Sequence, residues 1–348
     1  MSSCGTAFLI AIIISIIITP AVIKLAAATG AMDKPDARKV HKKPIPRIGG
    51  VGIYFACIVS VIAMAVLTDF DDEHTTEVIG LLISGSFIVF VGLVDDYKNL
   101  PAKVKLLGQI FAAFILVLIF DVRIDFLSDP FGDYIFLEDY VAIPLTIFWL
   151  VGLTNTVNLI DGLDGLAAGV SAIAAITIML VALEQNFLLV AVLTAALAGS
   201  AAGFLFYNSH PARIFMGDTG SMFLGFMLAG ISVIGAVKSA TTIALVVPIL
   251  ALGVPIFDTT FAIIRRLIGG QPIFKPDKGH LHHRLLSIGF TQRQAVFLMY
   301  VISALLGLSA VALTEVSRQM AMLILLVVVV AVLYGAKRLG ILRLADKR

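Results

Sequence analysis

The chain has 348 residues, of which 59% are hydrophobic and only 14% are charged, against about 25% charged in an average soluble domain. Its mean hydropathy is +1.03, which excludes a soluble globular protein because so apolar a chain cannot cover itself with polar surface. The formal net charge of +2 indicates no particular partner, and we expect no nucleic acid to bind. Cys4 and Cys57 lie in or beside apolar stretches without metal or redox spacing, which favours packing over a disulfide.

Apolar segments of roughly 20 residues, enough to cross a membrane, recur along the whole chain. We predict an all-α, polytopic membrane protein with about eleven spans, forming one integral membrane domain over residues 1–348. The first segment has no basic region before it, so we expect it to be a retained span and not a signal peptide. The expected spans are 5–27, 49–68, 78–94, 104–120, 141–160, 165–183, 187–206, 220–237, 241–263, 294–314 and 319–336.

Basic residues are distributed unevenly between the two sides of this topology. With the N-terminus outside, 22 of the 25 Lys and Arg residues fall on the inner side, and only Arg123, Lys238 and Arg318 fall outside. The positive-inside rule therefore predicts an outer N-terminus and an inner C-terminus. The outer loops are acidic, which we interpret as solvated surface. Within 122–140, alternating apolar residues on either side of a Pro-Phe-Gly turn predict a short hairpin.

Adjacent carboxylates mark the inner end of the third expected span. Asp95 and Asp96 end this span, and Lys98, Lys103 and Lys105 follow them. Ionisable groups at membrane depth are costly and indicate function, and a helix C-terminus disfavours negative charge. A divalent cation or ammonium groups would make this carboxylate pair tolerable. The alternative is an ordinary acidic helix boundary.

Two further inner segments carry acidic residues beside glycines. In NTVNLIDGLDGL (155–166), Asn158, Asp161 and Asp164 are spaced by three and would share one helix face. The segment lacks the spacing and final Glu of a calcium loop, and a polar turn between spans is its alternative reading. In NSHPARIFMGDTGS (208–221), Asp218 precedes a helix start whose free amides suit an anion, which a metal would bridge to the carboxylate. The alternative for this segment is a capped turn.

Two more polar features complete the inner side. Asp258 lies within the expected span 241–263, where a buried helix partner and a catalytic residue are equally good interpretations. The segment KPDKGHLHHR (275–284) holds three of the six histidines. Its cations favour hydrogen bonding to phosphate and sugar, with a zinc site and a solvated basic loop as alternatives. The basic run 34–47 would contact either a substrate phosphate or anionic lipid.

All five segments fall on the inner side, so loops 28–48, 95–103, 207–219 and 264–293 are expected to form one active-site face. Carboxylates, an amide, imidazoles and cations together suit metal-assisted chemistry on a phosphate ester. A secondary transporter is the rival from another class, and a zinc hydrolase is a third reading. The acidic residues lie at span ends on one side, and the halves show no duplication, which argues against a transporter.

The segments VDDY (94–97), NTVNLIDGLDGL, NSHPARIFMGDTGS and HLHH (280–283), in this order, resemble the polyprenyl-phosphate N-acetylhexosamine-1-phosphate transferases. The resemblance implies transfer of GlcNAc-1-phosphate from UDP-GlcNAc to undecaprenyl phosphate, with release of UMP and with Mg²⁺, or Mn²⁺ in its place, as cofactor. It implies a bacterial inner membrane, with the active site cytoplasmic and membrane lipids as surroundings. The product, undecaprenyl-pyrophosphoryl-GlcNAc, would start a cell-envelope glycan such as O-antigen or teichoic acid. The oligomeric state stays open, with a homodimer as one option.

Two departures distinguish branches within this family. The chain has HLHH where the peptidoglycan branch usually has three consecutive histidines, and PRIGG (46–50) where that branch usually has PTMGG. These differences favour the UDP-GlcNAc branch. Transfer from UDP-MurNAc-pentapeptide, in peptidoglycan synthesis, remains the alternative.

The resemblance also implies a role for each matching residue. Asp218 would ligate Mg²⁺, with Asn158 as a further ligand or a diphosphate contact. Asp95 and Asp96 would lie at the lipid-phosphate side as proton acceptors or metal positioners, and Asp161, also expected to be catalytic, would lie with Asp164 at the nucleotide side. The remaining expected contacts are Asn208 and Phe215 for uridine, His280, His282, His283 and Arg284 for sugar and pyrophosphate, and Lys43 and Lys105 for phosphate oxygens.

Overall fold

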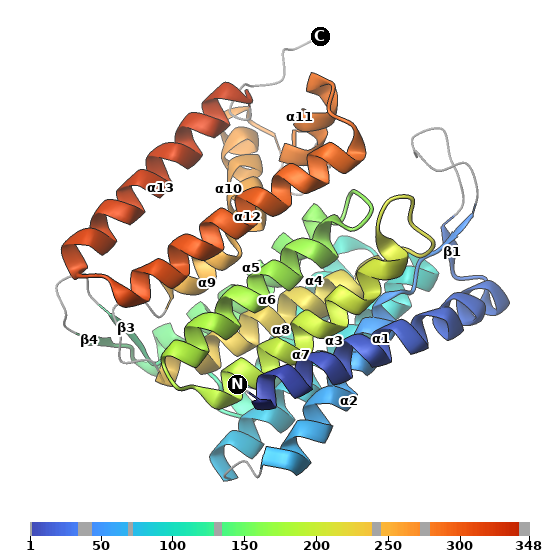
Figure 1. The fold of residues 1–348 in the computed structure, drawn as a ribbon, viewed down its shortest axis with the longest axis horizontal. Helices are drawn as coiled ribbons and strands as arrows, with labels where there is room; N and C mark the ends of the chain where they lie inside the picture. Colours follow the sequence, from blue (N-terminus) through green and yellow to red (C-terminus); the bar gives the residue numbers. More distant parts are fainter. Residues whose placement is uncertain are drawn as a thin grey trace.

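The computed structural model describes residues 2–33, 44–68, 72–128, 134–238, 245–271 and 279–340. In these ranges the chain is helical apart from two short hairpins, and the helices lie side by side in one bundle (Figure 1). The helices are α1 (Ser2–Thr29), α2 (Gly50–Thr68), α3 (Asp72–Lys98), α4 (Ala102–Phe114) continued by the π-helical turn η1 (Ile115–Ile119), α5 (Asp139–Ile160), α6 (Leu166–Glu184), α7 (Leu188–Asn208), α8 (Gly217–Lys238), α9 (Val246–Ala251), α10 (Gly253–Ile268), α11 (Leu281–Ile288), α12 (Gln292–Glu315) and α13 (Arg318–Arg338).

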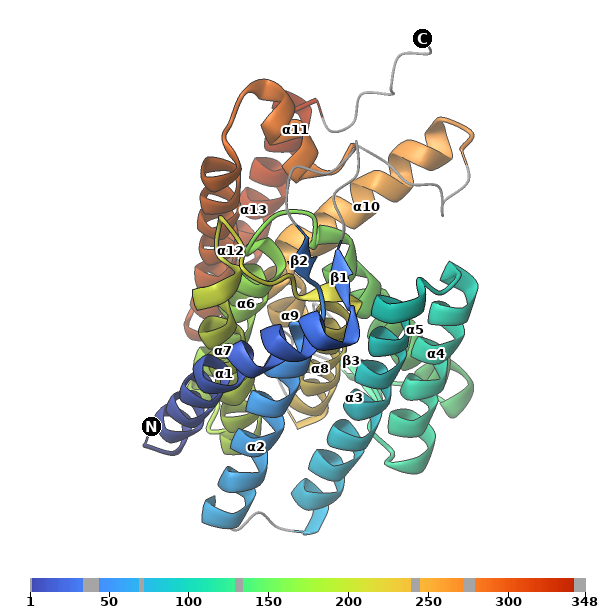
Figure 2. The same cartoon turned by 90° about the vertical axis from the view of Figure 1, so that its right-hand side faces the viewer.

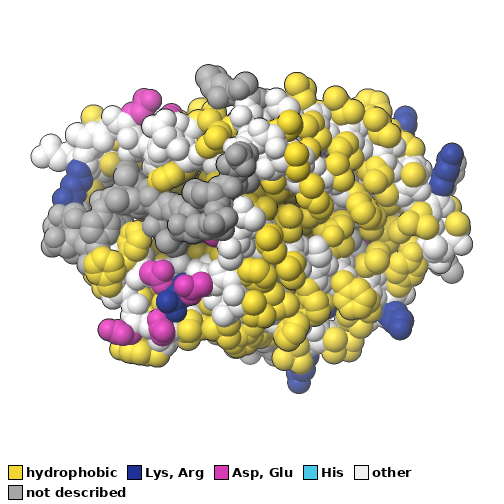
Figure 3. All heavy atoms as spheres, turned by 90° about the horizontal axis from the view of Figure 1, so that it is seen from below, with side chains coloured by type: hydrophobic (Ala, Val, Ile, Leu, Met, Phe, Trp, Pro, Cys, Tyr) yellow, Lys and Arg dark blue, Asp and Glu magenta, His cyan; other side chains and the backbone are white. Residues whose placement is uncertain are grey.

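Ten of the helices in the described ranges are long and apolar enough to cross a membrane. They are α1 to α8, with η1 extending α4, together with α12 and α13. Figure 3 shows one broad face of the bundle, which is covered mainly by hydrophobic side chains, as a surface in contact with lipid would be. The predicted all-α, polytopic membrane class is confirmed.

The expected span 241–263 is not a single helix, and this is where the predicted count of eleven differs from the ten helices found in the described ranges. The chain breaks at Leu252, where α9 ends and α10 begins. Pro248 and Pro255 lie on either side of the break, and neither can donate a backbone hydrogen bond. Figure 2 shows α10 running out past the ends of α3 and α4, toward the side where α11, β1 and β2 lie.

Two antiparallel hairpins lie at opposite ends of the bundle (Figure 1). The predicted hairpin in 122–140 is confirmed, because β3 (Phe126–Ser128) pairs with β4 (Tyr134–Phe136); its predicted turn at 130–132 is outside the described residues. A second pair, β1 (Met32–Asp33) with β2 (Ile45–Pro46), was not predicted. We call the end of the bundle that carries β1 and β2 the site end.

Helix α8 is the most enclosed of the candidate spans, with 94% of its apolar window buried, whereas α13 has only 11% buried. Helix α8 packs against α3 and α5. Gly225 allows α5 to approach closely, because a Cβ at this position would lie 2.8 Å from the Cα of Thr154. Small residues of this kind permit tight packing of membrane helices. The central place of α8 brings its first turn against the ends of both neighbours.

Candidate active site

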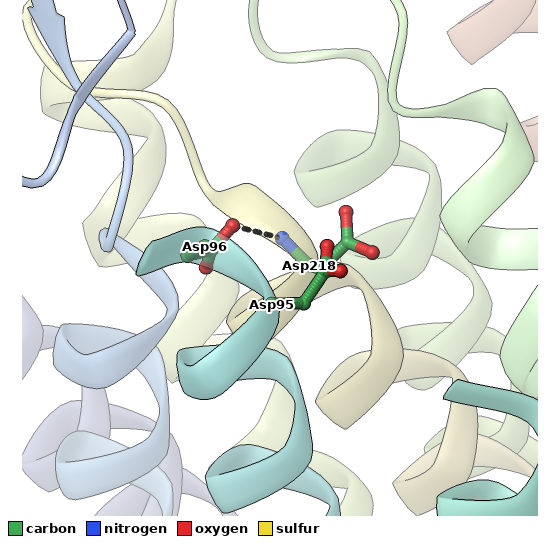
Figure 4. Close-up of side chains that lie close together, drawn as sticks. All are labelled: Asp95, Asp96 and Asp218. Carbon is green, nitrogen blue, oxygen red and sulfur yellow. Dashed lines mark hydrogen bonds between the residues drawn. The ribbon is translucent and has the colours of Figure 1, made fainter. Parts of the chain in front are cut away.

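Three carboxylates from two distant parts of the chain meet at the site end. Asp95 and Asp96 come from the last turn of α3, and Asp218 comes from the first turn of α8. One oxygen of each lies within 4.8 Å of the others. Figure 4 shows Asp95 beside the Asp218 carboxylate, while Asp96 turns toward the backbone of α8. This is the convergence that the sequence predicted for these segments.

Asp96 holds the start of α8. Its carboxylate accepts hydrogen bonds from the backbone N–H of Asp218 (3.0 Å), the N–H of Thr219 (3.0 Å) and the Thr219 hydroxyl (2.6 Å). The Arg47 guanidinium pairs with the same carboxylate at 3.2 Å, and the Asp96 side chain is wholly buried. A carboxylate at a helix N-terminus satisfies free amides and complements the helix dipole. Asp96 thus positions Asp218 from a neighbouring helix.

Lys105 links the other two carboxylates. Its ammonium donates to Oδ2 of Asp218 at 2.6 Å and lies 3.4 Å from Oδ2 of Asp95. Asp95 also accepts a hydrogen bond from the backbone N–H of Leu100 at 2.6 Å. Asn158 contacts Asp218 as well and donates its amide to the Ser221 hydroxyl at 2.8 Å.

Asp161 adds a fourth carboxylate, just beyond the end of α5. Burial first, and then the charges of Asp218, Asp96 and Asp164, raise the pKa of Asp161 to about 8. Asp161 therefore holds its proton near pH 7 beside the other carboxylates. A bound cation would favour the ionised form of Asp161.

Asp164 and Asn208 connect the α5–α6 turn to the segment before Asp218. Asp164 accepts a hydrogen bond from the backbone N–H of Ala212 at 3.1 Å, and its carboxylate lies 2.7 Å from Nδ1 of His210. The buried amide of Asn208 accepts from the N–H of Gly165 and donates to the carbonyl of Ile214. These contacts give both side chains a structural task, and their contacts with a nucleotide stay predictions.

The PRIGG segment lies against the residues that precede Asp218. The N–H of half-buried Phe215 donates to the carbonyl of Pro46 (2.7 Å), and the N–H of Gly49 donates back to the carbonyl of Phe215 (3.0 Å). Gly50 is obligatory here, because a Cβ would lie 2.0 Å from the backbone nitrogen of Gly220. Neither this pairing nor the contact of Arg47 with Asp96 was predicted from the sequence. The consecutive glycines next to a basic run were the available signal.

The histidine segment reaches the same site from α11. A Cβ on Gly162 would lie 2.6 Å from Nε2 of His282, so this histidine touches the α5–α6 turn. Burial lowers the pKa of His282 to about 4, with the neighbouring His283 as the next cause, so the imidazole is neutral near pH 7. Within the described part of the chain, Nδ1 of His282 and Nε of Arg284 are buried without a hydrogen-bond partner. His283 is exposed, and Lys43 lies outside the described residues, so its role stays a prediction.

The donor atoms indicate which metal the site end suits. In the ranges the structure describes, the one group of three or more His, Cys, Asp or Glu side chains placed to hold an ion is Asp95, Asp96 and Asp218. Oxygen ligands suit Mg²⁺ and Mn²⁺. A protein zinc site more often uses nitrogen and sulfur. The residues therefore fit a hard divalent cation better than zinc.

The fold and this site define a polytopic membrane protein with a carboxylate cluster at one end of its helix bundle. Residues 78–236, which contain all the clustered carboxylates, match the family described as glycosyl transferase family 4. The chain is 42% identical over 324 residues to the probable undecaprenyl-phosphate N-acetylglucosaminyl 1-phosphate transferase of Bacillus subtilis (strain 168), covering 93% of this chain and 88% of that protein.

Two other relatives extend the comparison. Decaprenyl-phosphate N-acetylglucosaminephosphotransferase of Mycobacterium leprae is 35% identical over 316 residues, covering 84% of this chain and 79% of its own length. Phospho-N-acetylmuramoyl-pentapeptide-transferase of Bacillus cytotoxicus is 30% identical over 327 residues, covering 87% of this chain and 94% of its own length. The chain therefore belongs to glycosyl transferase family 4, and within it to the polyprenyl-phosphate N-acetylhexosamine-1-phosphate transferases. It is a multi-pass membrane transferase.

Proposed function

We propose that this protein transfers GlcNAc-1-phosphate from UDP-GlcNAc to undecaprenyl phosphate, which releases UMP and forms undecaprenyl-pyrophosphoryl-GlcNAc. The observation that carries the proposal is the convergence of Asp95, Asp96 and Asp218 within 4.8 Å, with Lys105 between two of them. The relative from Bacillus subtilis, named for the same sugar and lipid, supports this choice of substrates. The reaction would be the first membrane step of a cell-envelope glycan.

The residues at the site end fit Mg²⁺, or Mn²⁺ in its place. Asp218 and Asn158 would hold the ion, with Asp95 next to it, whereas the oxygens of Asp96 are already engaged by α8 and Arg47. When bound, the divalent ion offsets the negative charge of the two phosphate-bearing substrates and polarises the phosphoryl oxygens. Asp95, Asp96, Asp161 and Asp218 outnumber the two cations beside them, Arg47 and Lys105, which gives the site a reason to hold such an ion.

The chain's own residues would position the reactants. The ammonium group of Lys105 would bind phosphate oxygens in competition with Asp218. The unpartnered Nδ1 of His282 and Nε of Arg284 offer further hydrogen bonds. An oxygen of the lipid phosphate attacks the phosphorus next to the sugar, and the bond from this phosphorus to the UMP oxygen breaks. A lipid phosphate has a second pKa of about 6, like phosphoserine, so a strong general base is not required. Asp95 would orient the lipid phosphate or accept a residual proton.

We place the site end on the cytoplasmic side of a bacterial inner membrane. The support is the distribution of basic residues, 22 of 25 of which fall on the inner side of the expected topology, as the positive-inside rule describes. Asp95, Asp218 and the histidine segment all belong to that side. A UDP-sugar would then reach the site from the cytoplasm and the lipid phosphate from the bilayer.

Release of UMP by the purified protein in detergent tests the proposal. We expect UMP release with UDP-GlcNAc and undecaprenyl phosphate, its loss after chelation, and its return with Mg²⁺ but not through zinc alone. A transporter would leave UDP-GlcNAc intact and release no UMP, so a lack of release would overturn the proposal. UDP-MurNAc-pentapeptide is the comparison donor, and faster release from it would assign the chain to the peptidoglycan branch.

A further inference from the structure

Asp258 is a buried carboxylate that the proposed reaction leaves unused. It lies on α10, three residues after Pro255, and its side chain is only 1% exposed. Burial of a carboxylate is costly unless hydrogen bonds compensate for the lost water. Both of its oxygens are compensated by one short stretch of chain. Oδ2 lies 2.9 Å from Nδ1 of His280, and Oδ1 accepts the backbone N–H of Leu281 at 2.7 Å.

These two contacts dock the start of α11 on α10. His280 is the residue before α11, and Leu281 is the first residue of this helix. Asp258 therefore caps α11 from the neighbouring helix α10, in the way that an N-cap Ser or Asp caps its own helix. A second contact lies further along α10, where Arg265 meets the backbone before α11. A Cβ on Gly279 would lie 2.3 Å from Nη2 of Arg265. Asp258 and Arg265 are seven residues apart, which places them on one face of α10.

The contact also decides which nitrogen of His280 is left for a substrate. A carboxylate only accepts hydrogen bonds, so Nδ1 of His280 must carry the proton that it donates to Asp258. Nε2 is then the nitrogen that remains for another partner. The His280 ring lies nearly parallel to that of His282, at 7° with 5.9 Å between centroids, and His282 touches Gly162 in the α5–α6 turn. The orientation of His280 is thus connected to the site itself.

We propose that Asp258 is a positioning residue that holds His280 in the Nδ1–H form and docks α11, so that the imidazoles of His280 and His282 face the sugar-pyrophosphate of the donor. This inference rests on the proposed function for its substrate, but the Asp258–His280 contact does not. Asp258 itself is too buried to touch a substrate. It acts through His280, as an orienting carboxylate acts through the histidine of a catalytic triad.

Asp258→Asn separates the two tasks of this side chain. Its Oδ1 still accepts the N–H of Leu281 and so keeps the helix cap, but its amide donates to Nδ1 of His280 and forces the proton onto Nε2. We expect the thermal midpoint in detergent to stay near that of the wild type, while kcat for UMP release falls about 10- to 100-fold, by analogy with the loss when the carboxylate behind a metal-bound histidine is removed. Asp139→Asn, at the opposite end of the bundle, is the matched control and should change neither value.

A double-mutant cycle tests whether Asp258 acts through His280. If it does, Asp258→Asn in a His280→Gln background should add less than about 3-fold to the loss, because effects within one unit are not additive. A full additional 10- to 100-fold loss would overturn the proposal. Histidine ¹⁵N chemical shifts provide a readout independent of activity. The His280 signal should change from the Nδ1–H to the Nε2–H pattern in Asp258→Asn, and an unchanged pattern would also overturn the proposal.

These two readouts separate failure of this inference from failure of the proposed function. If the wild type released no UMP, the reaction would be wrong, but the ¹⁵N experiment would still decide whether Asp258 fixes the His280 proton. If UMP release were normal in Asp258→Asn and the ¹⁵N pattern unchanged, the reaction would stand and the positioning role would not.

Discussion

A group of three Asp residues lies at each end of the helix bundle, and the two groups are arranged in opposite ways. At the site end, Asp95 and Asp96 are each only 4% exposed, and with Asp218 they bring oxygens within 4.8 Å. At the other end, Asp121, Asp125 and Asp139 surround Arg123, with side chains that are 78%, 44% and 75% exposed. The cluster at the site end is buried and contacts Lys105 and Arg47, whereas the cluster at the other end is exposed to water around Arg123.

This difference indicates function more reliably than the acidic residues themselves. Exposed ion pairs are solvated in either state and contribute little to stability. Buried carboxylates that share a site repel each other, and a fold keeps them only when a cation or a reaction requires them. The sequence separated the two groups by their expected side of the membrane, and the structure adds the difference in burial.

The largest expected effect on UMP release comes from a substitution at the site end, compared with one at the opposite end. Asp218→Ala should lower UMP release by at least about 10³-fold, the scale of losing a main electrostatic group in an active site, while Asp139→Asn should leave release unchanged. Turnover of both purified variants with UDP-GlcNAc measures this. Full activity of Asp218→Ala would contradict the proposal that Asp218 binds the metal ion.

A smaller loss is expected for Asp95→Asn. Since the lipid phosphate is already a competent nucleophile, the lost carboxylate should slow kcat by only about 10²-fold, the low end for a group that accepts a proton. Asp125→Asn, the matched change at the opposite end, should have no effect on kcat. Equal losses in Asp95→Asn and Asp218→Ala would mean that both ligate the ion.

The raised pKa of Asp161, about 8 against 3.8 for a free side chain, predicts a stability that depends on pH. Between these values the folded state holds a proton that the unfolded state has lost, so stability should fall as pH rises from about 4 to 8. Measured with a chelator present, the thermal midpoint should drop by a few degrees over this rise in pH. Asp161→Asn should flatten this slope, and so should excess Mg²⁺; a slope unchanged in the variant would show that another group causes the pH dependence.

The smallest effect is expected at Arg123 and its three Asp partners, at the end of the bundle opposite the site end. Arg123→Gln should lower the free energy of unfolding by no more than about 1 kcal/mol, because its three partners are largely exposed, and it should not change UMP release. Denaturant titration and the same turnover assay would check both statements. A large loss of activity would show that the two ends are coupled.

Much of the site could be predicted from the sequence because membrane topology restricts where loops can meet. Alternate loops emerge on one side of the bilayer, so Asp95 and Asp218 were expected together although the chain separates them widely. The β3–β4 hairpin followed from alternating apolar residues. These inferences use local patterns and one global rule, and neither requires knowledge of side-chain contacts.

Other features depend on contacts that no local pattern indicates. The hydrogen bonds of Asp96 to α8 join positions 122 apart in the chain and had no signal in the sequence, while its expected place at the lipid-phosphate side stays a prediction. The break at Leu252 is different, because Pro248 and Pro255 are local signals for it, and the uniformly apolar window around it favoured one continuous span instead. Asp258 was left open between a helix partner and a catalytic residue, and its contact with His280 supports the first interpretation.

The separation between Asp96 and the helix that it caps has a consequence for biosynthesis. Asp96 and the amide of Asp218 that it binds are 122 positions apart in the chain. The ribosome must therefore add more than 100 residues after α3 before α8 leaves the tunnel. At ~5–20 residues per second, the acidic pair of α3 waits roughly ten seconds in the nascent chain without the amides that later stabilise it. Insertion of α8 is therefore the event that brings the three carboxylates together, before α11 adds the histidines.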